Sequence, residues 1–215
     1  MKKLLFLCLF PFSVFSQAID HWETVIFDND IWRYYEGIAE PDTNWRGVTY
    51  DDSAWLLGEG GIGYGDGDDS TLISPVTSLY LRKSFNIIDT SEIAAAVLHV
   101  DYDDAFVAYL NDVEIARSNI GTVGDHPLFN QGSSSLHEAQ MYQGGLPDEF
   151  VISLDVLDTV LLPGNNILSV QVHNDNISSS DLTGRIFLSL GIENATNNYF
   201  TPPFWFSPPL IFTSS

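Results

Sequence analysis

Short runs of β-branched and aromatic residues recur along this chain, and Gly, Asn, Asp or Pro separates each run from the next. Within residues 166–174, Leu168, Val170 and Val172 share one parity and the residues between them share the other, as in a strand with two different faces. No amphipathic helix longer than two turns is apparent. The pattern predicts about nine strands, at residues 24–27, 31–35, 79–87, 95–102, 105–111, 113–117, 149–154, 166–174 and 184–193.

This pattern predicts an all-β fold. Asn111 and Asp112 separate two of the runs and tolerate positive φ angles, which predicts a tight hairpin. Antiparallel strands patterned on both faces predict an antiparallel β-sandwich, most simply a jelly roll.

The first sixteen residues are typical of a secretory signal peptide. Lys2 and Lys3 precede an apolar stretch of about twelve residues, shorter than the roughly twenty that a membrane helix needs, and Ser16 precedes a plausible cleavage point. Cys8 is the single cysteine and would be removed with the signal. The sequence therefore predicts a secreted or cell-surface domain that is stabilised by its core and has no disulfide.

The charge of the chain limits its partners. It carries 29 acidic and 8 basic residues, a formal net charge of −21, and loss of Lys2 and Lys3 with the signal would make this −23. Such a field disfavours nucleic acid and anionic membrane, which are themselves polyanions. Neutral polymers and divalent cations remain compatible with it.

The character of the sequence changes near its end. Residues 196–215 are rich in Pro and aromatic residues and show neither alternation nor turn signals. We therefore expect a sandwich domain over residues 17–195, and a linker with the start of a missing downstream domain over 196–215.

Several stretches together resemble a known family: "WRYYEG" (32–37), residues 44–68, "YLRKSF" (80–85), "VDYDDAFVAYLNDVEIAR" (100–117) and residues 161–183. They resemble the galactose-binding-like jelly-roll domain of secreted bacterial multidomain proteins, especially the domain before the kinase-like domain of CotH spore-coat-type proteins. They are also similar in order to the amino-terminal sandwich of β-galactosidase-type glycoside hydrolases. The resemblance implies a non-catalytic accessory module, and related domains often hold a structural calcium ion. Asp112 departs from the usual "LNG" turn.

Two acidic clusters are candidate calcium ligands. "GYGDGDDSTL" contains Asp66, Asp68 and Asp69, and a flexible Gly-Asp loop can supply the six to eight oxygens that calcium takes. Thr77 stands where a complete EF-hand loop would have its bidentate Glu. The alternative is a Gly-rich turn whose Asp side chains bond to their own backbone.

The second cluster is Asp101, Asp103 and Asp104, between the runs 95–102 and 105–111. Loop geometry is the favoured role, shared cation binding is second, and catalysis is third. Glycosidase chemistry needs two carboxyls about 5–10 Å apart with a sugar between them, and the spacing here does not establish that.

The polar loop after the run 166–174 is a candidate sugar site. It offers His173, Asn174 and Asp181 as hydrogen-bonding groups, and a sugar site also needs an aromatic platform. Trp45, in a Pro/Gly-rich loop, is the candidate exposed platform. The alternatives are a solvated loop for the first group and simple packing for Trp45.

No catalytic constellation is apparent. His137 and Glu138, in the long irregular stretch 118–148, form only a weak metal motif, and there is no nucleophile elbow or phosphate-cradling loop. Two functions remain: a module that binds carbohydrate or a cell-surface polymer, or a spacer that packs against a downstream catalytic domain. They differ in whether an exposed aromatic side chain lies beside the His173/Asn174 loop.

Overall fold

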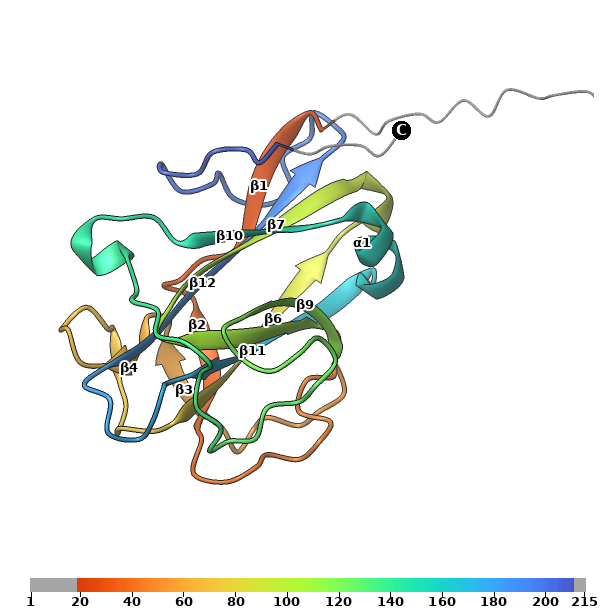
Figure 1. The fold of residues 1–215 in the computed structure, drawn as a ribbon. Helices are drawn as coiled ribbons and strands as arrows, with labels where there is room; N and C mark the ends of the chain where they lie inside the picture. Colours follow the sequence, from red (N-terminus) through yellow and green to blue (C-terminus); the bar gives the residue numbers. More distant parts are fainter. Residues whose placement is uncertain (1–18, 211–215) are drawn as a thin grey trace, which may run out of the picture.

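A computed structural model describes residues 19–210 and consists of two facing β-sheets (Figure 1). Sheet A has the order β10-β7-β12-β4-β5, and β1 also pairs with β12. Its strands are β1 (His21–Ile26), β4 (Ile62–Tyr64), β5 (Thr71–Leu72), β7 (Ile93–Tyr102), β10 (Asp148–Ile152) and β12 (Leu182–Ile192). All pairs are antiparallel except β4 with β5.

Sheet B is antiparallel throughout, with the order β3-β2-β6-β11-β8-β9. Its strands are β2 (Ile31–Glu36), β3 (Leu56–Glu59), β6 (Ser78–Ile87), β8 (Ala105–Leu110), β9 (Val113–Ser118) and β11 (Gly164–His173). The only helical elements among residues 19–210 are short: α1 (Leu154–Val160), η1 (Thr90–Glu92) and η2 (Met141–Gln143). The predicted all-β sandwich is confirmed.

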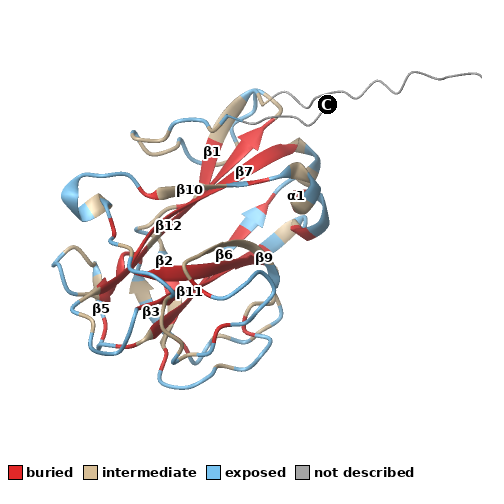
Figure 2. Cartoon of the chain, viewed as in Figure 1, coloured by how far each residue is buried: buried red, intermediate tan, exposed pale blue. Residues whose placement is uncertain are grey.

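The core lies between the two sheets, where the strands are buried along most of their length (Figure 2). Leu168, Val170 and Val172 of β11 are fully buried there, on the face that the alternation predicted. Ile186 and Leu188 of β12 pack into the same core from sheet A. Burial of each such side chain contributes about 1.5–3 kcal/mol, so the aliphatic stripes of these strands are the main source of stability.

A second apolar cluster covers the outer face of sheet B. Tyr80 of β6 and Tyr109 of β8 project from this face, and Trp45 and Trp55 of the segment between β2 and β3 lie over them. The ring centroids of Trp45 and Tyr80 are 5.0 Å apart. This face is therefore covered by its own chain.

The predicted tight hairpin joins β8 and β9, and its turn residues Asn111 and Asp112 have φ angles of 52° and 78°. Strands β3, β4 and β5 were not predicted. They occupy residues 56–72, where many glycines remove the alternation that marks a strand.

The segment predicted to be a linker contacts sheet A. The backbone of Phe200 pairs with Thr24 of β1, and Trp205 packs edge-on against His99 and Phe187, with centroid distances of 5.1 and 5.0 Å. The division into 17–195 and 196–215 stays a prediction. The predicted signal peptide, residues 1–16, lies outside the described residues. Within residues 19–210, no helix has the length and hydropathy to span a membrane.

Candidate metal centre

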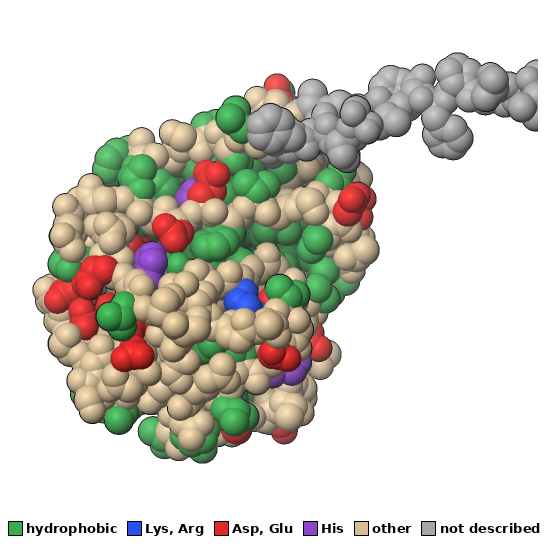
Figure 3. All heavy atoms as spheres, in the orientation of Figure 1, with side chains coloured by type: hydrophobic (Ala, Val, Ile, Leu, Met, Phe, Trp, Pro, Cys, Tyr) green, Lys and Arg blue, Asp and Glu red, His purple; other side chains and the backbone are tan. Residues whose placement is uncertain are grey.

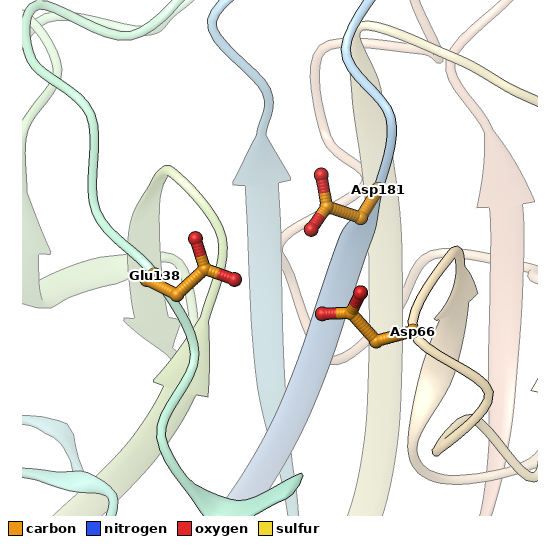
Figure 4. Close-up of side chains that lie close together, drawn as sticks. All are labelled: Asp66, Glu138 and Asp181. Atoms are coloured by element: carbon orange, nitrogen blue, oxygen red, sulfur yellow. The ribbon is translucent and has the colours of Figure 1, made fainter. Parts of the chain in front are cut away.

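Three carboxylates from three different loops converge at one end of the sandwich. Asp66 follows β4, Glu138 lies between β9 and β10, and Asp181 precedes β12. Each offers an oxygen within 4.8 Å of the others, and the three side chains point toward one another (Figure 4). Acidic side chains gather over this part of the surface (Figure 3). Such an arrangement is repulsive unless a proton or a cation offsets the charge.

Asp103 lies beside these three carboxylates and is only 5% exposed. It lines a cavity of about 10 Å³ together with Asp66 and Asp181. Among the described residues, no backbone N–H and no basic side chain donates a hydrogen bond to its carboxylate. Burial, together with the charges of Asp104, Asp181 and Glu138, raises the pKa of Asp103 to about 8.

The sheet topology brings these four carboxylates together. Leu182 of β12 pairs with Tyr64 at the end of β4, and Gly184 pairs with Tyr102 at the end of β7. The residues that follow β4 and β7 therefore lie at the same end of sheet A as the residues that precede β12. Glu138 is added by the long segment between β9 and β10.

Two further aspartates position the segment that carries Glu138. Both carboxylate oxygens of Asp101 accept backbone N–H groups, from Gln140 at 2.6 Å and from Met141 at 3.0 Å. Asp104 accepts the N–H of His137 at 2.9 Å and that of Asp175 at 2.8 Å. Hydrogen bonds to charged acceptors contribute about 1.5–3 kcal/mol each, so both carboxylates act as loop anchors.

The six predicted calcium ligands therefore differ in what their carboxylates contact. Asp66 and Asp103 lie at the convergence point, whereas Asp101 and Asp104 are directed to backbone amides. Asp68 lines the cavity, but its carboxylate lies 3.4 Å from Nε of Arg185. Asp69 accepts the hydroxyl of Thr183 at 2.7 Å, and burial raises its pKa to about 6.

Sequence reasoning did not place Asp181 and Glu138 in this group of carboxylates. Asp181 was assigned to the sugar site, and Glu138 was considered only with His137. The ring of His137 instead stacks on Tyr102, at a centroid distance of 4.1 Å, and its Nδ1 lies 3.0 Å from the Tyr102 carbonyl oxygen. No local motif could have found the group, because it depends on the pairing of β12 with the unpredicted β4.

The donor set fits a hard divalent cation. Asp66, Asp103, Glu138 and Asp181 supply only oxygens, from loops of different length. Calcium accepts such irregular oxygen sites more readily than magnesium, which demands near-ideal octahedral geometry. A cation would also offset the charge of the buried Asp103 carboxylate, whose acidic neighbours raise its pKa.

The predicted sugar ligands His173 and Asn174 are fully buried. Nδ1 of His173 lies 2.8 Å from the carbonyl oxygen of Gln131, and burial lowers the pKa of its ring to about 4. The amide of Asn174 donates to the Tyr64 hydroxyl at 2.9 Å and to the Asp181 carbonyl at 2.7 Å. These two side chains connect loops inside the protein and offer no surface to a sugar.

The expectation that Trp45 is exposed is wrong, because its side chain is only 4% exposed. Its ring contacts Tyr80 and Tyr109, and its carbonyl accepts a hydrogen bond from the buried guanidinium of Arg82. Packing, which was the alternative interpretation, explains this tryptophan.

No protein-family model matches this sequence, and no curated protein matches it. Solved structures share the fold. β-Glucuronidase 2 of Bacteroides uniformis is 14% identical, over 79% of this chain and 18% of that chain, with a TM-score of 0.50. A calcium-binding mutant of the same enzyme has 14% identity, the same coverage and a TM-score of 0.48. A β-glucuronidase of an uncultured Clostridium has 17% identity over 87% of this chain and 31% of that chain, with a TM-score of 0.46.

At these identities the likeness concerns the fold alone. The chain spans less than a third of the length of these enzymes. The resemblance to the CotH family stays a prediction.

Proposed function

We propose that this chain is a secreted, non-catalytic accessory module that binds carbohydrate or a cell-surface polymer, and that one calcium ion holds its loops. Asp66, Asp103, Glu138 and Asp181 would ligate this ion. The observation that carries the calcium site is the buried Asp103 carboxylate, which accepts no backbone N–H and pairs with no basic side chain among the described residues, and which has three acidic neighbours. Bound calcium would offset this charge and link four segments that are distant in the sequence.

The dimensions of the cavity support a structural role for these carboxylates. Its volume of about 10 Å³ accommodates a single water-sized species. A glycosidase needs two carboxyls that flank a sugar ring, about 5–10 Å apart, and the ring cannot enter such a cavity. The carboxylates are therefore suited to a small cation.

The parent protein would be larger than this chain. The similar structures are enzymes of which this fold forms a minor part. The resemblance of residues 100–117 and 161–183 to the domain that precedes a CotH kinase-like domain suggests a parent of that type.

The calcium site is tested by titrating Ca²⁺ into the chelator-treated protein in a calorimeter. We expect one ion per chain for the wild type and for Asp158→Asn, which removes one exposed charge on α1, and no binding for Asp103→Asn. Equal binding by all three proteins would contradict the site. A glycan array probed in calcium and again in chelator tests the carbohydrate function.

One observation favours the alternative function, a spacer that packs against a neighbouring domain. An aromatic segment that contains Phe200, Trp205 and Phe206 packs on β1 and on the outer face of sheet A. This face therefore binds an apolar segment of the polypeptide. Calcium binding without binding to any glycan on the array would support the spacer function.

A further inference from the structure

A groove of about 570 Å³ lies beside the polar loop that follows β11. Its walls come from four segments: the chain after β2, the chain before β6, and two loops that contact each other. The lining residues are Gly37, Ile38, Pro75, Val76, Thr77, Phe129, Asn130, Asp175, Asn176 and Ile177. The half-buried ring of Phe129 thus lies next to the loop that the sequence analysis singled out as a sugar site.

The lining of this groove combines apolar surface with hydrogen-bonding groups. Ile38 and Ile177 are 73% and 58% exposed and stand with Phe129 as its apolar walls. Asn130, Asp175 and Asn176 supply amides and one carboxylate. No Lys or Arg lines the groove, so nothing there would offset the charge of an anionic ligand. The chemistry matches an uncharged polyol that has one apolar face, as a pyranose ring has.

The walls are held in place by hydrogen bonds to neighbouring segments. The backbone N–H of Phe129 donates to Glu40 at 2.7 Å, and its carbonyl accepts the hydroxyl of Ser78 at 2.7 Å. The facing loop is fixed by the bond from the Asp175 N–H to Asp104. A Cβ at Gly132 would lie only 2.0 Å from the Asp175 carbonyl oxygen, so the two loops are in direct backbone contact. A preformed site of this kind loses less entropy when it binds a ligand.

We propose that this groove binds a neutral oligosaccharide. One sugar ring would rest on Phe129 and Ile177, with its hydroxyl groups bonded to Asn130, Asp175 and Asn176. The inference rests on the proposed carbohydrate-binding function and assigns its location and ligand class.

The groove and the candidate metal centre share a loop. Residues 175–177 form one wall of the groove, and Asp181 of the same loop belongs to the metal centre. Asp104, which holds Asp175, directly follows Asp103 in the chain. A cation that fixes Asp103 and Asp181 should therefore order this wall, and its removal should weaken sugar binding.

A second groove provides a matched control. It has a volume of about 440 Å³ and lies on the outer side of sheet B, lined by Arg33, Tyr50, Leu57, Lys83 and Asn165 among others. It contains no residue of the loops that carry the metal centre. Leu57 is 59% exposed there, which is close to the exposure of Ile177. Unlike the first groove, it is lined by basic side chains, those of Arg33, Arg82 and Lys83.

The experiment measures binding of the full chain to arrays of neutral and uronic-acid-containing oligosaccharides, in calcium and in chelator. We expect a neutral glycan to bind, with at least tenfold weaker affinity for Ile177→Ser and for Phe129→Ala and unchanged affinity for Leu57→Ser. Ile177→Ser is the decisive variant, because its exposed side chain can change without loss of the fold. Chelation should weaken binding of the wild type as well.

The outcomes separate this inference from the proposed function. Binding that survives Ile177→Ser but is lost in Leu57→Ser would overturn the groove assignment and retain carbohydrate binding. Binding to acidic glycans alone would do the same. No binding to any glycan on either array would overturn both proposals. Glycan binding that is unaffected by chelator would overturn the link between the cation and the groove.

Discussion

Replacement of Asp103 by Asn should change stability with opposite signs in the presence and absence of calcium. The substitution preserves the shape of a 5% exposed side chain whose pKa is raised to about 8, so without a cation this group holds a proton at pH 7 that it would release in the unfolded chain. Asn needs no such proton uptake on folding, and it adds an amide donor among carboxylates. In chelator we therefore expect the variant to be at least as stable as the wild type at pH 7. In calcium it should be less stable, because the ion loses a ligand.

The magnitude follows from linkage. A ligand present at one hundred times its dissociation constant stabilises the native state by about 2.7 kcal/mol. For a chain of this length each kcal/mol raises Tm by about 2–4 °C, so calcium should raise the Tm of the wild type by roughly 5–11 °C. The variant should show a shift near zero.

The assay is calorimetric unfolding of the wild type, Asp103→Asn and Asp158→Asn, each in calcium and in chelator. The Asp158 variant removes one exposed charge on α1 and controls for the net charge. The reasoning is refuted if calcium raises Tm equally in all three proteins, or if Asp103→Asn destabilises the protein strongly in chelator.

Three further changes are predicted. Asp104→Ala removes the acceptor of two backbone N–H groups, so it should lower the free energy of unfolding, measured with denaturant, by about 3–5 kcal/mol. It should also weaken both calcium and sugar binding. Unchanged affinity for both ligands would show that the two loops are anchored elsewhere. His173 has a pKa of about 4 in the folded protein against 6.5 in the unfolded chain, so the unfolded state binds more protons between these values. Stability should then fall by up to roughly 3 kcal/mol as the pH drops from about 6.5 to 4, and His173→Gln should flatten this part of the pH profile of unfolding. Trp45→Ala should lower the free energy of unfolding by about 3–5 kcal/mol, while the folded fraction keeps its glycan affinity. Loss of glycan affinity without loss of stability would instead identify Trp45 as a sugar-stacking platform.

Much of the fold was predictable because strand signals are local. The alternation of Leu168, Val170 and Val172 places β11 with its apolar face toward the core, and Asn111 and Asp112 adopt the positive φ angles of the predicted hairpin. Each of these depends on a few neighbouring residues and on the geometry of the pleat. Strands β3 to β5 were missed because many glycines interrupt the alternation in residues 56–72, and long-range backbone pairing holds this chain in the sheets.

The burial of individual polar and aromatic residues was not predictable in the same way. Trp45 lies in a loop whose sequence is typical of an exposed segment, yet that loop folds over Tyr80 and Tyr109. His173 lies on the outer face of its strand, as the alternation indicated, but a distant loop covers it through Gln131. Which loop covers which face is determined by long-range packing, and strand periodicity carries no information about it.

The sequence by itself determined that this chain is an acidic β-sandwich with carboxylate-rich loops. Only the tertiary structure decided which carboxylates meet. Asp101, Asp103 and Asp104 are near neighbours in the chain, yet two of them accept backbone amides and one faces Asp66 and Asp181. The physical reason is that local propensity fixes the strands and turns, whereas the pairing of β12 with β4 and β7 decides which loop ends bring their carboxylates together.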